Sequence, residues 1–257
     1  MPTKTLRGTF VWHELMTTDP KAAQRFYTKL IGWGTQPFEH NPSYVMWMNG
    51  ETPVGGVMAL PDEAKEIGAP PSWISYVAVP DVDETARRAA KLGGKALRAP
   101  EDIPEVGRFA AIADPQGAVL CAFRGLPEME GHGGPPGIGE FTWHELATTD
   151  PEGAFRYYSE LFGWEKSDAM DMGDAGVYQI YALEGTQLGG IYRKPAGMPG
   201  PPDWLYYINI RDVKPAVEQV KKLGGRVLHG PAEVPGGWIV QCLDPQGAAF
   251  ALYNAAE

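Results

Sequence analysis

The stretch F-V-W-H-E-L-M-T-T-D-P at residues 10–20 decides the fold, because it returns as F-T-W-H-E-L-A-T-T-D-P at residues 141–151. Trp12 returns as Trp143, an offset of 131 residues (143 − 12). The same offset relates three further pairs, which are Tyr27 and Tyr158, Gly32 and Gly163, and Trp33 and Trp164. A repeat of this length is a whole domain rather than a solenoid unit. Each half is therefore expected to carry its own version of one site.

The composition favours two domains that bind neither nucleic acid nor membranes. At about 100 to 200 residues per domain, 257 residues give two domains. A net charge of −10 opposes binding to phosphate backbones and to anionic membrane surfaces. The sequence shows no apolar run of signal-peptide or membrane-span length, so we expect a cytoplasmic protein. Cys121 and Cys242 fall at non-equivalent positions of the repeat, which favours reduced, buried thiols over a duplicated disulfide.

Each half opens with the same predicted elements. Residues 9–17 read as a strand, and Asp19 of the following Asp-Pro then caps a helix that ends at Gly32. The second half repeats this pattern from residue 141 to Gly163. Short β-like segments follow at residues 43–49, 54–59, 177–183 and 188–192.

A second round of the pattern completes each half. It consists of a strand at residues 73–79 or 204–210, a helix capped by Asp81 or Asp212, a Gly-Gly suited to a left-handed helix end, and two strands around a D-P-Q-G turn. Strands that return to one sheet, with helices on one face, predict an α+β domain. We expect domain 1 at residues 1–125, a Gly/Pro-rich linker at 126–139 and domain 2 at 140–257.

This doubled βαβββ pattern resembles the vicinal oxygen chelate superfamily, which includes glyoxalases, extradiol dioxygenases and bleomycin resistance proteins. The resemblance rests on W-H-E-L-x-T-T-D-P and F/Y-Y-x-x-L-x-G-W in the first module of each half, and on L-G-G and D-P-Q-G-A in the second. It implies two glyoxalase-like domains that pair within the chain. In each, paired βαβββ modules form a curved, half-open barrel sheet whose concave face, the cup, holds the site. In many members a divalent metal sits there, on four side chains from four strands.

The places that the resemblance assigns to metal ligands hold neither an acid nor an imidazole. In the first half they are Trp12, Ile74 and Cys121, together with V-G-G-V-M. In the second half they are Trp143, Leu205 and Ala251, together with L-G-G-I-Y. Imidazole and carboxylate groups are what divalent ions of this kind require. We therefore expect no metal site and no other cofactor.

The His-Glu pairs at residues 13–14 and 144–145 do not restore a metal site. Neighbours on a strand point to opposite faces, so one pair cannot chelate a single ion in the cup. If Trp12 faces the cup then Glu14 does too, and His13 faces the helices. We interpret His13 and His144 as hydrogen-bonded residues between sheet and helix.

The cup faces of the strands are predicted to be mainly apolar and aromatic. The candidate ligand-binding residues are Trp12, Tyr76, Cys121, Phe123 and Arg108 in the first half, and Trp143, Tyr207 and Tyr253 in the second. Apolar walls with a few polar groups are typical of small-molecule sites. The alternative is that these side chains pack against one another without a ligand.

Glu14 and Glu145 are the candidate catalytic or ligand-anchoring residues. A carboxylate on an apolar wall has to be paired, hydrated or neutral, and a carboxyl group of this kind in a cleft is a candidate for acid–base work. The alternative is a salt bridge at the rim, for which Arg108 is the candidate partner of Glu14.

The sequence thus predicts a glyoxalase- or bleomycin-resistance-like protein that binds small apolar or aromatic molecules in metal-free cups. It would either sequester them or act on them without a metal. One alternative is a metal-dependent lyase or dioxygenase whose ligands lie elsewhere, and another is a scaffold with collapsed cups. The identity of the ligand and the occurrence of turnover stay open at this point.

Overall fold

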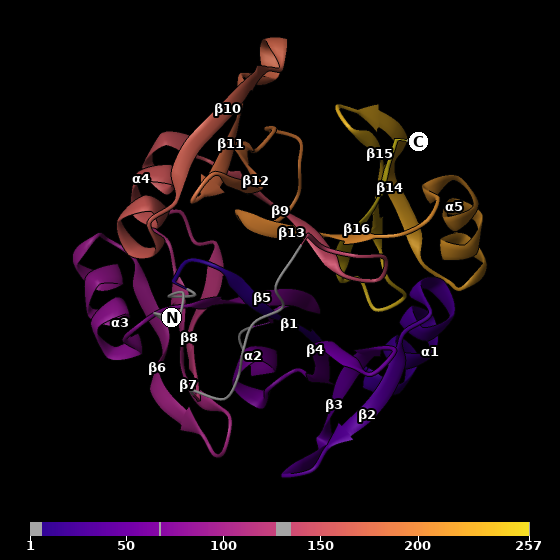
Figure 1. Cartoon of the computed structure of the whole chain (residues 1–257), viewed down its shortest axis with the longest axis horizontal. Coiled ribbons are helices and arrows are strands. Elements are labelled where there is room, and N and C mark those ends of the chain that lie inside the picture. Colours follow the sequence, from indigo (N-terminus) through magenta and orange to yellow (C-terminus); the bar gives the residue numbers. More distant parts are fainter. Residues whose placement is uncertain (1–6, 67, 127–134, 257) are drawn as a thin grey trace. The chain divides into compact units, whose positions relative to one another are not determined.

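Each half of the repeat forms its own mixed sheet in the computed structural model, which describes residues 7–66, 68–126 and 135–256. Residues 127–134 of the expected linker lie outside these ranges. The first half contains β1 (Phe10–Thr17), α1 (Pro20–Ile31), β2 (Gly34–Phe38), β3 (Asn41–Asn49), β4 (Thr52–Ala59), α2 (Asp62–Glu66), β5 (Ser72–Ala78), α3 (Val82–Lys91), β6 (Lys95–Ile103), β7 (Gly107–Ala113) and β8 (Val119–Gly125) (Figure 1). The second half contains β9 (Phe141–Thr148), α4 (Pro151–Phe162), β10 (Glu165–Asp171), the 3-10 turn η1 (Gly173–Ala175), β11 (Val177–Leu183), β12 (Thr186–Arg193), β13 (Asp203–Asn209), α5 (Val213–Lys222), β14 (Arg226–Val234), β15 (Gly237–Leu243) and β16 (Ala249–Ala255).

The sheet topology confirms the α+β class and the paired βαβββ modules. The strand order is β2-β3-β4-β1-β5-β8-β7-β6 in the first sheet and β10-β11-β12-β9-β13-β16-β15-β14 in the second, so both sheets are open. Within each module the first and last strands pair in parallel, as β1 does with β4 and β9 with β12. The sequence analysis gave no residue range for β6 or β14, and α2 lies in a connection for which no helix was predicted. None of the helices in the described part of the chain has the length and apolar character needed to cross a membrane.

The expected caps explain where the long helices begin and end. The Asp19 carboxylate accepts a hydrogen bond from the backbone N–H of Ala22 at 2.9 Å, and Pro20 takes the first position of α1. Gly32 ends α1 with a φ of 92°, which an L side chain rarely adopts. Asp150 and Gly163 do the same for α4, so these sequence predictions are confirmed.

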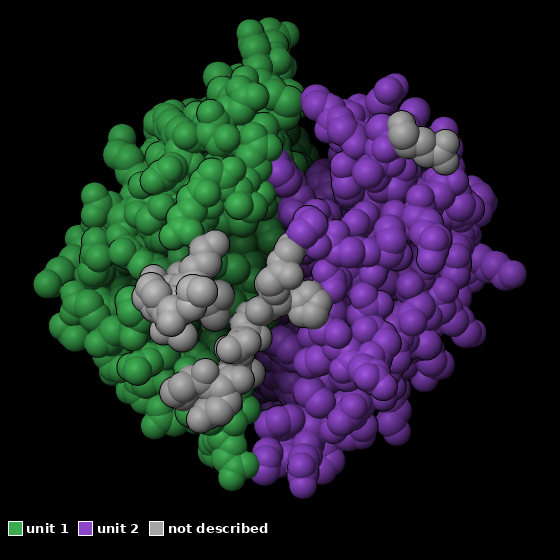
Figure 2. All heavy atoms as spheres, in the orientation of Figure 1, with its two compact units in different colours: residues 1–11, 75–133, 144–204 green, residues 12–74, 134–143, 205–257 purple. Residues whose placement is uncertain are grey.

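The described chain divides into two compact units, each built from one module of each half. Unit 1 comprises residues 1–11, 75–133 and 144–204, and unit 2 comprises residues 12–74, 134–143 and 205–257, apart from the residues drawn in grey in Figure 2. Unit 1 therefore holds α3 together with α4, and unit 2 holds α1 together with α5. In both units a helix from one half packs against a helix from the other.

Reciprocal hydrogen bonds join the two halves inside these units. In unit 2 the Tyr27 hydroxyl donates to Asp244 at 3.3 Å and accepts from the Trp73 indole N–H at 2.9 Å. In unit 1 Tyr158 donates to Asp114 at 3.1 Å and accepts from Trp204 at 3.3 Å. The same repeat positions thus meet in both units, with the halves exchanged. These contacts agree with the expected pairing of two domains within the chain.

Each aspartate of these contacts also organises its own D-P-Q-G turn. Asp114 Oδ1 accepts from the backbone N–H groups of Gln116, Gly117 and Ala118 at 2.9, 2.7 and 2.9 Å. Burial raises the pKa of the Asp114 carboxyl group, and these hydrogen bonds oppose that rise. Burial, followed by the charge of Asp114, raises the pKa of Tyr158, so this phenol stays neutral and acts as the donor.

His144 lies buried in unit 1 as a neutral residue. Its ring stacks on Phe10 with centroids 3.6 Å apart, and its Nδ1 lies 3.1 Å from the carbonyl oxygen of Leu188. Burial lowers the pKa of His144 to about 3, partly offset by that hydrogen bond. In unit 2 His13 stacks in the same way on Phe141, with centroids 3.8 Å apart. The interpretation of His144 as a buried, hydrogen-bonded residue is confirmed.

We predict that Tyr27→Phe and Tyr158→Phe each destabilise the fold by about 1 to 3 kcal/mol, because each leaves a buried indole donor and a buried carboxylate short of a partner. The two costs should add, since the two hydroxyls share no partner. Urea unfolding at neutral pH measures this. The matched control is Tyr253→Phe, whose hydroxyl donates to the Gly236 carbonyl at an exposed place. Equal costs for Tyr27→Phe and the control would contradict the prediction.

We also predict an acid destabilisation that depends on His144. The unfolded histidine gains a proton below about pH 6.5, whereas the folded one stays neutral down to about pH 3. Stability from this group is therefore present above pH 6.5 and is lost as the pH falls, by at most about 1.4 kcal/mol per pH unit. Between pH 6.5 and 4.5, His144→Phe should show a shallower loss than the wild type. His40→Gln, at an exposed position, is the control. Parallel pH profiles of wild type and His144→Phe would refute the assignment.

Candidate functional site

In unit 2, Glu14 lies on the face of β1 opposite α1 and takes part in a relay of hydrogen bonds. The Trp12 indole N–H donates to the Tyr44 hydroxyl at 2.7 Å, and that hydroxyl is hydrogen-bonded to the Glu14 carboxylate. Glu14 is 7% exposed. Burial, and then the charge of Glu14, raise the pKa of Tyr44 well above its ordinary value, so the phenol remains a neutral donor. The expectation that Trp12 and Glu14 share a face is confirmed.

In unit 1, Glu145 has a matching phenol partner. The Tyr178 hydroxyl on β11 donates to Glu145 Oε2 at 2.9 Å, and Glu145 is 8% exposed. The ring of Tyr192 on β12 stacks on Tyr178 with centroids 5.7 Å apart. Burial, and then the charge of Glu145, raise the pKa of Tyr192. The second site thus has two neutral phenols close to its carboxylate.

A glycine beside each glutamate makes room for the tyrosine. Gly56 is the cross-strand partner of Glu14, and Gly190 is the partner of Glu145. A Cβ added to Gly56 would lie 2.0 Å from the Tyr44 hydroxyl oxygen, and one added to Gly190 would lie 2.0 Å from ring atoms of Tyr178. Each ring therefore lies directly on the glycine backbone. These glycines belong to the two Gly-Gly segments for which the resemblance implied a ligand.

The residues at these places do not fit a resident divalent metal ion. The first strands contribute the indoles of Trp12 and Trp143, and the glycine positions are overlain by phenols. Within residues 7–66, 68–126 and 135–256 there is no group of three or more His, Cys, Asp and Glu side chains that could hold a metal. Indoles and neutral phenols are not the nitrogen, thiolate or carboxylate donors that zinc, manganese or iron sites use.

The other candidates of the first half lie in unit 1 and separate into two groups. Tyr76 packs against Phe123 with ring centroids 6.0 Å apart, and Cys121 is its cross-strand partner. Cys121 lies outside any disulfide and is 2% exposed. Arg108 is held elsewhere, since its guanidinium nitrogens lie 2.7 to 2.9 Å from carboxylate oxygens of Asp83 and Asp102. Its ion pairs are thus with these two residues, although the sequence suggested a salt bridge with Glu14.

The remaining candidates of the second half lie in unit 2. Gln241 donates its side-chain N–H to the Tyr207 hydroxyl at 2.8 Å. The Tyr253 hydroxyl donates to the backbone carbonyl of Gly236 at 2.8 Å, and Trp143 is half-buried at the start of β9. The structure therefore assigns Tyr253 a backbone contact and Tyr207 a polar side-chain partner.

Sequence reasoning missed the two tyrosines that bind the glutamates. Tyr44 and Tyr178 are related by an offset of 134 residues (178 − 44), not 131, and Gly56 and Gly190 share that offset. A repeat search that allows a three-residue slip would have paired them.

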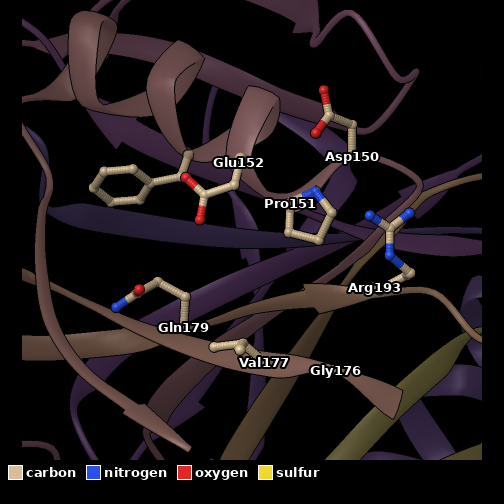
Figure 3. A pocket seen from close by; sticks show the side chains of 8 residues that line it. Asp150, Pro151, Glu152, Gly176, Val177, Gln179 and Arg193 are labelled. Atoms are coloured by element: carbon tan, nitrogen blue, oxygen red, sulfur yellow. The ribbon is translucent and has the colours of Figure 1, made fainter. Parts of the chain in front are cut away.

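A cavity of about 300 Å³ lies at the N-terminus of α4 (Figure 3). It is lined by Asp150, Pro151, Glu152, Phe155, Gly176, Val177, Gln179 and Arg193. Val177 and Gln179 flank Tyr178 on β11, so the cavity opens on the opposite face of this strand. None of the candidate residues lines it. Arg193 donates to the backbone carbonyl of Thr149 at 2.8 Å.

Comparison with known protein sequences identifies the family of this chain. The sequence profile of the Glyoxalase/Bleomycin resistance protein/Dioxygenase superfamily matches residues 9–122 and 137–252. The chain is 34% identical to "Putative glyoxylase CFP32" of Mycobacterium tuberculosis, over 97% of this chain and 96% of that protein. It is 29% identical to "Anthracycline biosynthesis protein DnrV" of Streptomyces peucetius, over 97% and 94%.

Solved structures show the same fold at low sequence identity. The Mn(II)-bound glyoxalase from Novosphingobium aromaticivorans matches with a TM-score of 0.65 and 15% identity, over 99% of this chain and 84% of that chain. The 2,3-dioxygenase LapB from Pseudomonas sp. KL28 matches with a TM-score of 0.64 and 12% identity, over 99% and 94%. The profile matches in both halves and the 34% identity to a full-length relative carry the assignment. The chain belongs to the Glyoxalase/Bleomycin resistance protein/Dioxygenase superfamily, with two glyoxalase-type domains in tandem.

Proposed function

We propose that this protein binds small, largely apolar or aromatic molecules that bear a hydroxyl or carbonyl group, and that it does so at Glu14 and Glu145 without a metal ion. The observation that carries the proposal is the pairing of a buried carboxylate with a phenol, which occurs twice, as Glu14 with Tyr44 and as Glu145 with Tyr178. Binding at these residues would lead either to sequestration of the ligand or to its turnover without a metal ion.

The chemistry of the pairs supports binding of a hydrogen-bonding ligand. A carboxylate accepts several hydrogen bonds, so it can hold a ligand hydroxyl while it keeps its tyrosine. Alternatively, the neutral phenol can donate its hydrogen bond to a carbonyl oxygen of the ligand. The carboxylate can also take a proton from a ligand hydroxyl and return it. Removal of water by the apolar surroundings would strengthen each of these contacts.

The surroundings of the pairs support an aromatic ligand. Half-buried Trp12 and Tyr192 border the two carboxylates, and aromatic side chains bury a large flat area against a planar ring. The relative of Streptomyces peucetius is named for anthracycline biosynthesis.

A metal-dependent lyase or dioxygenase is the second candidate. The likeness to the Mn(II)-bound glyoxalase and to LapB favours it, but these proteins are 15% and 12% identical to this chain and share its fold alone. Against it stand the glycines and indoles at the expected ligand places. The two candidates differ in a directly measurable quantity, the metal content.

We predict far less than one equivalent of zinc, nickel, manganese or iron per domain in protein purified without an affinity tag. The reason is the absence of a sufficient donor set among the described residues. Elemental analysis by mass spectrometry, before and after dialysis against a chelator, measures it. Near one equivalent per domain, lost together with ligand binding on chelation, would favour the second candidate.

We predict that Glu14→Gln weakens binding of 2-naphthol by roughly tenfold to a hundredfold, because a hydrogen bond to a charged acceptor is worth about 1.5 to 3 kcal/mol. Glu145→Gln should weaken binding of phenol, a smaller ring with the same donor. Equilibrium dialysis measures both affinities, and Glu51→Gln, at an exposed turn, is the control variant. Binding of 2-methoxynaphthalene, which has no donor, should not respond to Glu14→Gln. If either variant unfolds while the folded fraction keeps its affinity, the carboxylates are structural.

A further inference from the structure

The two glutamate surfaces share three residues in the same register. We define the Glu14 surface as Trp12, Glu14, Met16, Tyr44, Met46, Gly56 and Met58, and the Glu145 surface as Glu145, Ala147, Tyr178, Ile180, Gly190 and Tyr192. On the first, Glu14 pairs with Gly56 and Gly56 with Met46; on the second, Glu145 pairs with Gly190 and Gly190 with Ile180. Both surfaces therefore place a carboxylate, a glycine and a phenol alike.

Both surfaces lie on the strand face opposite the nearest helix. Trp47 on β3 packs against Tyr27 of α1, with ring centroids 5.6 Å apart, and it alternates with Met46. Leu15 and Val57 are fully buried and alternate with Glu14 and Gly56. The alternation of strand side chains then directs the Glu14 surface away from α1. The same reasoning applies to the Glu145 surface, where Leu146 and Ile191 are fully buried.

The side chains around the shared residues differ between the surfaces. Met16, Met46 and Met58 of the Glu14 surface occupy the repeat positions of Ala147, Ile180 and Tyr192. Met16 and Met58 are direct cross-strand partners, so their side chains project from neighbouring positions on one face of the sheet. Methionine side chains are flexible and polarisable and make favourable contacts with aromatic rings. The Glu14 surface thus has an adaptable, thioether-rich wall that the Glu145 surface lacks.

The two surfaces also differ in solvent exposure, and the Glu14 surface is the more exposed of the two. Tyr44 and all three methionines of the Glu14 surface are half-buried. On the Glu145 surface Tyr178 and Ile180 are each 8% exposed and Ala147 is 9% exposed. Tyr192 stacks on Tyr178 there, whereas the equivalent position of the Glu14 surface holds Met58. The carboxylate–phenol pair of the second half is therefore covered by a ring at the position where the first half has a flexible chain.

We propose that the two duplicated surfaces have different ligands: fused-ring aromatic molecules bearing a hydroxyl bind at the Glu14 surface, and Tyr192 closes the Glu145 surface to them. The inference rests on the proposed function and adds which surface takes which ligand. The ring faces contact the thioethers of Met16, Met46 and Met58 beside the Trp12 indole. The ligand hydroxyl lies toward the Glu14–Tyr44 pair.

An exchange of one residue between the surfaces tests this directly. With 2-naphthol as the probe, wild-type protein should bind one equivalent per chain by equilibrium dialysis. Met58→Tyr, which copies the second surface onto the first, should weaken that binding at least tenfold. Tyr192→Met, the reverse exchange, should create a second equivalent of binding. Two equivalents of similar affinity in the wild type, or no effect of either exchange, would overturn the inference while the proposed function stands.

A measurement on the wild type alone guards against a variant that does not fold. Saturating 2-naphthol should slow the oxidation of Met16, Met46 and Met58 by hydrogen peroxide, followed by peptide mass spectrometry. Met172, which is 53% exposed and lies in the second half, is the internal control and should oxidise at an unchanged rate. Equal oxidation with and without 2-naphthol would overturn the inference. If the wild type binds neither 2-naphthol nor phenol, the proposed function fails and this inference fails with it.

Discussion

Two buried hydrogen bonds, from Tyr27 to Asp244 and from Tyr158 to Asp114, hold together the architecture on which both sites depend. Each joins the first helix of one half to the D-P-Q-G turn of the other half. The aspartate is tied to its own turn by backbone N–H groups, so helix and turn are fixed to each other by one side chain. A buried carboxylate is costly unless it is hydrogen-bonded in this way. These contacts hold the helices α1 and α4 on one face of their sheets. The opposite faces carry Glu14 and Glu145.

The faces that carry the glutamates also depend on a hydrogen bond between a tyrosine and a buried carboxylate. A neutral phenol satisfies a buried carboxylate, and a glycine on the intervening strand lets the two meet. Any side chain at Gly56 or Gly190, including a metal-binding one, would collide with this phenol. At both places a hydrogen-bonded phenol thus occupies the space beside the glycine. The duplication has kept these geometrically demanding residues in both halves, whereas the residues around them differ.

Much of the fold could be predicted from the sequence, because its signals are local. The caps at Asp19 and Asp150, the glycine helix ends and the 131-residue offset needed no knowledge of distant contacts. Strand alternation also placed Trp12 and Glu14 on one face. The phenol partners could not be predicted in this way, since Tyr44 reaches Glu14 across β4 and their meeting depends on strand register. The ion pairs of Arg108 could not be predicted either. The pair with Asp102 depends on strand register, and the pair with Asp83 depends on where a helix begins.

The central claim is that ligand binding at these surfaces needs no metal ion. The most direct test is the affinity for 2-naphthol of chelator-treated protein, measured by tryptophan fluorescence with and without added Mn(II). The Trp12 indole lies beside the Glu14–Tyr44 pair and supplies the signal. The account predicts the same dissociation constant and the same stoichiometry in both conditions. Binding that disappears on chelation and returns in proportion to added Mn(II) would contradict it.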